Sequence, residues 1–264
     1  MNPWESAMRR MVCVVAVGLM AMGARGFAQQ SAPVAPDKAA PVAAAESQQK
    51  LEMKVARMEL ELEDWAQLER YRAADLALPE SEPGRVVFYG DSITDGWVKN
   101  GGKFFPGKPY VNRGISGQTT PQMLVRFRQD VVALHPEAVV MLAGTNDIAG
   151  NTGPSTLGMI EDNFRSMTEI AKANGIRVVL ASVLPVKTYP WRPSVADPAG
   201  KIEELNAWIK GYCAQEKLTY LDYWTSMADK DGGMKPGISL DGVHPNAAGY
   251  AIMEPLAESA LAEK

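Results

Sequence analysis

Cysteine and histidine are scarce in this chain of 264 residues, which holds only two of each. The cysteines are Cys13 and Cys213, and the first falls in a segment that we expect to be removed, so no intrachain disulfide is predicted. Any imidazole chemistry must use His135 or His244. Histidine, cysteine and carboxylate residues form no cluster with metal-ligand spacing, and we therefore expect no metal and no cofactor.

A basic excess and a membrane-spanning run are also missing. Acidic residues outnumber basic ones by 31 to 27, which argues against a nucleic-acid partner and against a polybasic membrane tether. The apolar run from Met11 to Gly23 is too short for a stable span. Arg9 and Arg10 precede it and a small-x-Ala site ends at Ala28, so residues 1–28 are predicted to be a secretory signal peptide. Export to the bacterial periplasm or the medium follows, by the Sec or the twin-arginine route, without a stable membrane anchor.

Two segments of different composition follow the predicted signal peptide. Residues 29–46 are rich in Gln, Ala, Pro and Ser, which predicts a flexible tether. Residues 47–77 carry apolar side chains at spacings of three and four, which predicts a long amphipathic helix. Such a helix would pack on the domain or on a second subunit, which leaves a homodimer open. The apolar positions are Leu51, Val55, Met58, Leu62, Trp65, Leu68 and Tyr71.

Residues 83–264 are predicted to form a single α/β domain. Apolar runs without polar interruption are typical of parallel strands that are buried on both faces. Helical patterns lie between them, and this alternation predicts a three-layer α/β/α sandwich with a parallel sheet of about five strands. The expected strands are Val86–Tyr89, Tyr110–Arg113, Ala138–Ala143, Ile176–Val183 and Thr219–Asp222.

Polar groups of different kinds follow the first three strands, as Ser92, Gly114 and Asn146. Ligands of open α/β sheets bind at this carboxyl edge. Asp241 and His244 share one turn of a C-terminal loop, where an acid and a base can act together. A serine nucleophile needs such a pair, and it also needs N–H donors aimed at the developing oxyanion. The pattern therefore predicts acyl transfer.

These blocks together resemble the SGNH (GDSL-like) hydrolase family. The resemblance covers about residues 85 to 255, and four blocks in order are far more specific than one. It implies that Ser92 is the nucleophile, His244 the base and Asp241 the orienting acid. It also implies an oxyanion hole from the amides of Ser92 and Gly114 and the side chain of Asn146, and a flavodoxin-like strand order 2-1-3-4-5. The blocks are Gly90-Asp91-Ser92-Ile93, Gly114, Gly144-Thr145-Asn146-Asp147 and Asp241-Gly242-Val243-His244-Pro245.

Within the family, the sequence looks closest to the branch of platelet-activating-factor acetylhydrolase subunits and bacterial acyl and carbohydrate esterases. The resemblance thus implies an exported serine esterase that acts on small acyl esters, such as acetyl groups on carbohydrates. A lysophospholipase or thioesterase of the same mechanism is an alternative. A non-catalytic binding protein of flavodoxin-like fold is another, since a loop at a helix N-terminus can cradle phosphate.

Three more residues have two interpretations each, and His135 has one. Trp97, Trp191 and Arg192 would line the acyl or alcohol pocket, or they would serve packing. His135 precedes the third strand, and six strand residues at ~3.3 Å each would put it ~20 Å from the carboxyl edge. We therefore interpret His135 as structural.

Overall fold

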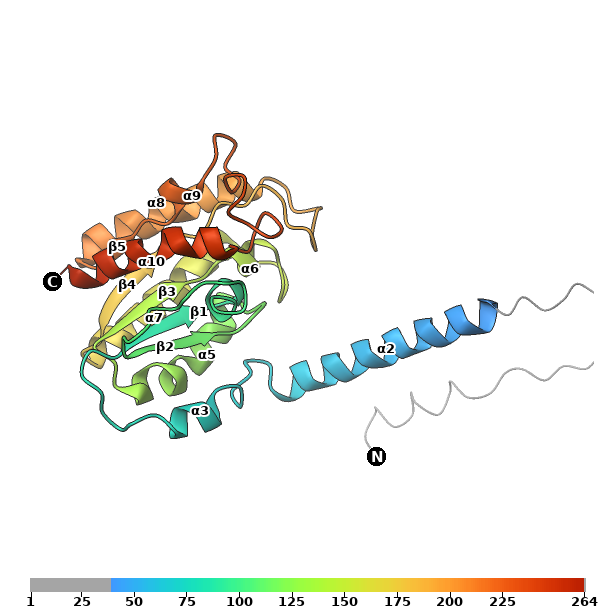
Figure 1. Ribbon diagram of the computed structural model, residues 1–264, viewed down its shortest axis with the longest axis horizontal. Helices are drawn as coiled ribbons and strands as arrows, with labels where there is room; N and C mark the ends of the chain where they lie inside the picture. The colour runs from blue at the N-terminus through green and yellow to red at the C-terminus, as the bar shows by residue number, and fades with distance from the viewer. Residues whose placement is uncertain (1–38, 264) are drawn as a thin grey trace, which may run out of the picture. The chain divides into compact units, whose positions relative to one another are not determined.

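The computed structural model describes residues 39–263. At its centre lies a parallel sheet with the order β2-β1-β3-β4-β5 (Figure 1). This order and the predicted three-layer architecture are confirmed. The strands are β1 (Val86–Gly90), β2 (Tyr110–Gly114), β3 (Ala138–Leu142), β4 (Arg177–Ala181) and β5 (Thr219–Leu221).

The register brings the ends of the three central strands together. Gly90 of β1 lies opposite Gly114 of β2 and Leu142 of β3. Every residue of β1 and of β3 is buried, as their uninterrupted apolar sequences predict. The segments that follow these three strands therefore begin side by side at one edge of the sheet.

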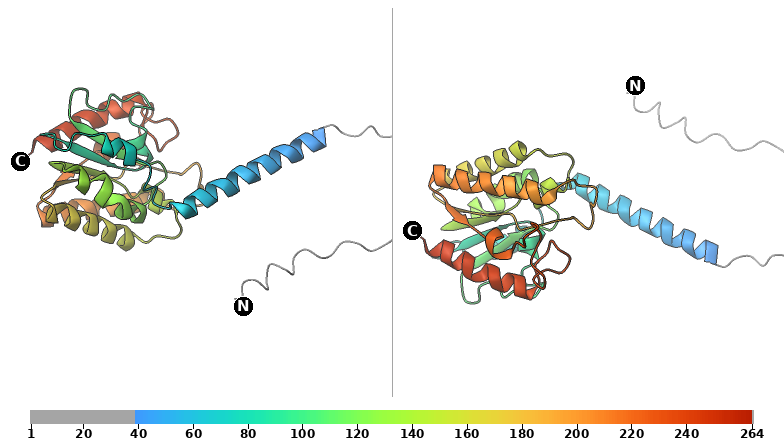
Figure 2. Two further views of the ribbon diagram at one scale, coloured as in Figure 1. Left: turned by 90° about the horizontal axis from the view of Figure 1, so that it is seen from below. Right: turned by 90° about the horizontal axis from the view of Figure 1, so that it is seen from above.

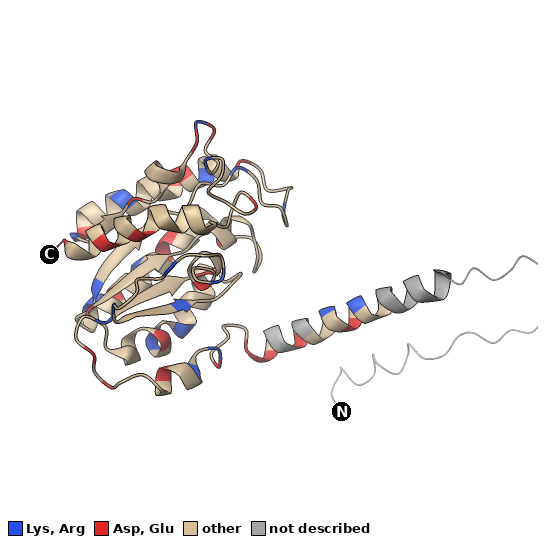
Figure 3. Cartoon of the chain, viewed as in Figure 1, with Lys and Arg blue, Asp and Glu red and all other residues tan. Residues whose placement is uncertain are grey.

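Helices cover both faces of the sheet, and alternate residues of β1 show how. Val87 and Tyr89 belong to a core cluster that contains residues of α5 (Thr120–Asp130), α7 (Leu157–Ala173) and α8 (Pro198–Glu216). Val86 and Phe88 belong to a second cluster, with residues of α9 (Trp224–Met227) and α10 (Ala247–Ala262). Figure 2 shows α10 on one side of the sheet and α7 on the other. Charged residues lie mainly on the helices and loops, with both signs interspersed (Figure 3).

Three very short helices connect these elements. α4 (Ser92–Asp95) follows β1 and α6 (Thr145–Ile148) follows β3, so both begin at the carboxyl edge. The 3-10 helix η1 (Val132–Leu134) leads into β3 at the opposite edge. The two edges of the sheet therefore differ. At the carboxyl edge, the strands β1 and β3 lead into the N-termini of short helices, whereas the opposite edge holds connections that lead into the strands.

The N-terminal part differs from the prediction. Helix α2 (Ala39–Glu63) ends well before residue 77, and α3 (Arg72–Leu76) is separate. The single helix over 47–77 is wrong because the Asp64 carboxylate accepts the backbone N–H groups of Leu68 and Glu69 and because Gln67 has φ 54°. The tether over 29–46 is wrong where α2 occupies 39–46, and its first ten positions lie outside the described residues. So does the predicted signal peptide.

The chain divides into units of residues 1–51 and 52–264, and α2 crosses the boundary. Within the second unit, Met58 and Leu62 of α2 are 51% and 83% exposed, so the predicted docking of these side chains is not found. A homodimer stays a prediction. In the part of the chain that the structure describes, no helix is both long and apolar enough to cross a membrane.

Candidate active site

Ser92 stands at the first position of α4, directly after β1. The Asp91 side chain caps this helix by accepting the Ile93 N–H at 2.9 Å. The backbone N–H of a residue at the start of a helix has no partner within that helix, and it faces the same end as the strand edges. The local sequence thus presents both a hydroxyl and a free amide at residue 92.

The loop before α10 presents an aspartate and a histidine as one unit. Oδ1 of Asp241 accepts the backbone N–H groups of Val243 and His244 at 3.0 and 2.8 Å. Oδ2 lies 2.8 Å from Nδ1 of the His244 ring. The Ser239 hydroxyl closes the loop, since it donates to the His244 carbonyl and accepts from the amides of Asp241 and Gly242.

The other ring nitrogen of His244 reaches the serine. Nε2 lies 2.9 Å from Oγ of Ser92, although 152 residues separate the two in the chain. Partial burial disfavours the charged form of Asp241, but the hydrogen bonds from His244 and Val243 outweigh it and lower the pKa of this carboxyl. An ionised Asp241 can hold the ring with Nδ1 protonated, which leaves Nε2 as an acceptor for the hydroxyl.

Asn146 is the second residue of α6 and is almost fully buried at the base of the same site. Its Nδ2 donates to the Gln118 carbonyl at 2.9 Å, and its Oδ1 accepts from Nδ2 of Asn151 at 2.8 Å. A side-chain amide has two N–H groups. One is therefore used to fix the orientation, and the other is left for a ligand.

The structure does not bring the Gly114 amide into this group. The Gly114 N–H donates to Oδ1 of Asn112 at 2.9 Å. A Cβ at this position would lie 2.1 Å from the backbone nitrogen of Asp95, so close packing of β2 against α4 requires the glycine. Sequence reasoning missed Gly117, which lines the site, has φ 82°, and has an N–H without a hydrogen-bond acceptor among the described residues.

A buried arginine forms hydrogen bonds to the ends of two strands. Arg126 of α5 is fully buried and donates to the carbonyls of Gly90 and Arg113 at 3.0 and 2.9 Å. It also donates to the side chains of Gln118 and Asp130, at 2.5 and 2.9 Å. One guanidinium thus connects the ends of β1 and β2 to the segment that holds the Asn146 amide.

These groups open into one cleft with a volume of about 1300 Å³. Trp191 and Arg192 line it as predicted, and the Trp191 ring centroid lies 6.1 Å from that of His244. The interpretation of Trp97 as a pocket residue is wrong, because its side chain is 1% exposed and packs in an aromatic cluster against Phe88 and Tyr250. Besides the residues named above, the lining includes Asp64, Trp65, Gln67, Glu69, Arg70, Ser116, Gln122 and Thr152.

Two buried carboxyl groups lie beneath the cleft. Burial raises the pKa of Asp91 to about 7, and its Oδ2 has no hydrogen-bond partner among the described residues. Burial also raises the pKa of Asp147 to about 6, despite hydrogen bonds to its carboxylate from the hydroxyl and N–H of Thr120. Those hydrogen bonds connect α6 to α5, so Asp147 has a structural role.

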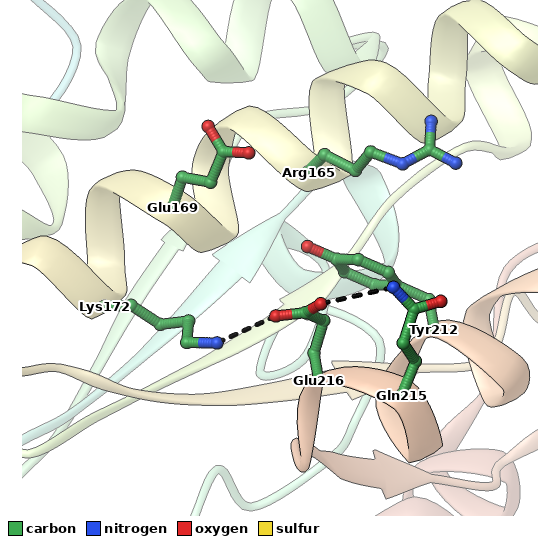
Figure 4. Close-up of a pocket in the computed structure, with 6 residues that line it drawn as sticks. All are labelled: Arg165, Glu169, Lys172, Tyr212, Gln215 and Glu216. Atoms are coloured by element: carbon green, nitrogen blue, oxygen red, sulfur yellow. Dashed lines mark hydrogen bonds and ion pairs between the residues drawn. The ribbon is translucent and has the colours of Figure 1, made fainter.

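A second cavity, of about 360 Å³, lies between α7 and α8 (Figure 4). Its lining is mainly charged, and Lys172 pairs with Glu216 across it at 2.9 Å. None of its lining residues is a serine, histidine or cysteine. His135 is also remote from the first cleft, since it follows η1 and precedes β3 at the other edge of the sheet.

Known proteins resemble this chain in both sequence and fold. The sequence model of the GDSL-like lipase/acylhydrolase family matches residues 88–252. A GDSL-like lipase from Bacteroides thetaiotaomicron is 44% identical, with a TM-score of 0.72, and the match covers 74% of this chain and 97% of that one. A Bacteroides fragilis protein assigned as an acylhydrolase is 45% identical, with a TM-score of 0.73 and coverages of 75% and 97%.

An acetylxylan esterase from Geobacillus stearothermophilus is similar in fold only. It is 19% identical, with a TM-score of 0.56, and the match covers 70% of this chain and 96% of that one. No curated protein matches the sequence.

Proposed function

Because this chain belongs to the GDSL-like lipase/acylhydrolase family and is a hydrolase of esters, we propose that Ser92, His244 and Asp241 are its catalytic triad. The observation that carries this proposal is the continuous chain of contacts from Oγ of Ser92 through the His244 ring to Asp241, at 2.9 and 2.8 Å. His244 takes the serine proton as Oγ attacks the acyl carbon. Asp241 orients the ring and stabilises the imidazolium.

The oxyanion hole in this proposal consists of the backbone amides of Ser92 and Gly117 and the Asn146 side chain. Gly117 replaces Gly114, whose amide is already bound to Asn112. The three donors belong to segments that follow β1, β2 and β3, which start side by side. Preorganised donors of this kind stabilise the charge of the tetrahedral intermediate without reorganising during the reaction.

The proposed substrate is a small acyl ester, of the acetyl type, on a carbohydrate alcohol. Most side chains of the cleft lining carry amide, hydroxyl or charged groups, which suit a polar alcohol, and the exposed lining also includes a substantial apolar area. The lysophospholipase alternative would use this apolar area for a long acyl chain, and the dependence of activity on acyl length separates the two substrate classes. The leader-like residues 1–28 support export as part of the same proposal.

A panel of p-nitrophenyl esters with rising acyl length, together with O-acetylated sugars, tests this function. We expect kcat/KM to be highest for acetyl and to fall as the acyl chain lengthens, with acetate released from the acetylated sugars. A maximum at long acyl chains would contradict the substrate class. Absence of hydrolysis of every ester by the folded protein would contradict the function itself.

A further inference from the structure

The cleft has one wall that lies outside the family match. The turn segment between α2 and α3, residues 64–70, contributes five of the lining residues, whereas the match begins at residue 88. The family model therefore does not include this wall. Its lining residues are Asp64, Trp65, Gln67, Glu69 and Arg70.

Glutamine side chains hold the backbone of this wall in place. Gln122, Gln118 and Gln129 donate to three carbonyls of the segment, those of residues 65, 66 and 68, at 2.6, 2.8 and 2.7 Å. Ala66 anchors the turn in the interior, since it is only 4% exposed. Gln118 is the same residue whose carbonyl orients the Asn146 amide. The wall is therefore rigid and is connected to the proposed oxyanion hole.

Trp65 stands on this rigid wall with 43% of its surface exposed. Trp97, by contrast, is 1% exposed and fills the core. Trp191 also lines the cleft and is 41% exposed, and its Nε1 donates to Asn151 at 3.0 Å, which fixes the ring. Two indoles thus present apolar area inside the cleft. Exposed indole faces of this kind can stack on the apolar face of a ligand.

Other groups of the cleft lining suit the recognition of hydroxyls. Ser116 and Thr152 line the cleft with hydroxyls, and the Arg192 guanidinium has no hydrogen-bond or ion-pair partner in the described part of the chain. A pyranose ring has apolar C–H faces, which stack on aromatic rings, and hydroxyls at its edges, which bind amides, hydroxyls and guanidinium groups. A volume of about 1300 Å³ exceeds what a single acetyl ester needs.

We propose that Trp65 is a specificity-determining residue that, with Trp191, stacks on sugar rings of an O-acylated oligosaccharide whose ester lies at Ser92. This inference rests on the proposed function, because it concerns the alcohol part of the same substrate. It assigns the sugar-binding wall to residues 64–70. The acyl group lies at the triad and the sugar extends along the wall.

Kinetics of Trp65→Ala on two kinds of substrate test this assignment. The substrates are p-nitrophenyl acetate, which lacks a sugar, and O-acetylated disaccharides of glucose, xylose and mannose. For the best disaccharide we expect KM to rise roughly 3- to 10-fold, the size of one lost aromatic contact. Activity on p-nitrophenyl acetate should fall less than activity on the disaccharide, and the melting temperature should stay unchanged.

Two further variants keep the result interpretable. Trp65→Phe keeps an aromatic face and should recover most of the affinity for the disaccharide, whereas Trp65→Leu keeps apolar bulk alone and should not. Trp208→Leu is the matched control, because Trp208 stacks on Tyr212 in a helix that is not part of the cleft lining. Trp208→Leu should change neither the KM for p-nitrophenyl acetate nor the KM for the disaccharide.

The outcomes separate this inference from the proposed function. Wild-type protein that hydrolyses neither substrate would contradict the proposed function. Wild-type activity on both, with an unchanged disaccharide KM in Trp65→Ala, would overturn the role of Trp65 alone. Equal losses on both substrates would also overturn it, as would a loss that grows with acyl length, because Trp65 would then bind the acyl chain.

Discussion

The carbonyl oxygen of Gln118 accepts a hydrogen bond of 2.9 Å from Nδ2 of Asn146. This contact uses one of the two N–H groups of the Asn146 amide and fixes the direction of the other. Because Gln118 is itself held by the buried Arg126, the donor is set in place before any substrate arrives. Preorganisation of this kind distinguishes an oxyanion hole from an ordinary polar lining.

Asn146→Ala should therefore lower kcat far more than it raises KM. The lost N–H would act on charge that develops in the tetrahedral intermediate, and one such donor contributes ~3–4 kcal/mol, or ~10²–10³ in kcat. Steady-state kinetics on p-nitrophenyl acetate, with a thermal melt of the same preparation, measure both quantities. A lower melting temperature with kcat retained would instead make Asn146 a structural residue.

Replacement of each histidine in turn tests the base. His244→Ala should abolish turnover, because no other group lies within hydrogen-bond reach of Oγ of Ser92 in the described part of the chain. His135→Ala is the matched control at the other edge of the sheet, and it should keep full activity. Loss of activity in the His135 variant, with the His244 variant active, would refute the assignment of the base.

Asp91 should make stability depend on pH. Its pKa in the folded state is about 7, above the ordinary value of 3.8, so between these pH values the folded protein binds a proton that the unfolded chain releases. The free energy of unfolding contributed by this group therefore falls as the pH rises from about 4 to about 7. Asp91→Asn cannot titrate and keeps an oxygen for the Ile93 N–H. The melting temperature of the variant minus that of the wild type should increase from pH 5 to pH 8; a difference independent of pH would show that Asp91 does not titrate in this range.

The buried Arg126–Asp130 pair should carry much of the stability beneath the site. Both side chains are fully buried and 2.9 Å apart. Arg126→Met would leave the Asp130 carboxylate without its partner, which costs ~3–5 kcal/mol of the free energy of unfolding. Denaturant titration measures this loss. Arg72→Met, which breaks the exposed pair with Glu69, is the control and should change little; equal effects of the two variants would contradict the account.

The sheet could be predicted from the sequence because its central strands β1 and β3 are uninterrupted apolar runs. Ser92 could be proposed because it follows the first of these strands, and Asp241 and His244 because they stand three residues apart in one loop. The C-terminal end of the helix predicted over 47–77 could not be found from the sequence. Apolar residues continue at helical spacing through Trp65 and Leu68, although the hydrogen bonds to the Asp64 side chain have already ended the helix. Periodicity reports which residues are apolar, and it does not report a competing hydrogen bond.

The sequence does not distinguish Gly114 from Gly117 as the oxyanion donor. Both lie at or after the end of the second strand, and only the structure shows that Asn112 accepts from the first amide, while Gly117 lines the cleft and its N–H has no acceptor among the described residues. The same holds for Trp97, which continues a motif that carries the nucleophile yet packs inward against Phe88. Spacing along the chain does not tell which groups are already satisfied by their neighbours.

Covalent labelling at Ser92 tests the central claim most directly. The protein is treated with a fluorophosphonate, and peptide mass spectrometry locates the adduct while activity on p-nitrophenyl acetate is followed. The account predicts one adduct, at Ser92, that forms in step with the loss of activity, and a folded Ser92→Ala variant that neither labels nor turns over. An adduct at another residue, or full activity in Ser92→Ala, would contradict it.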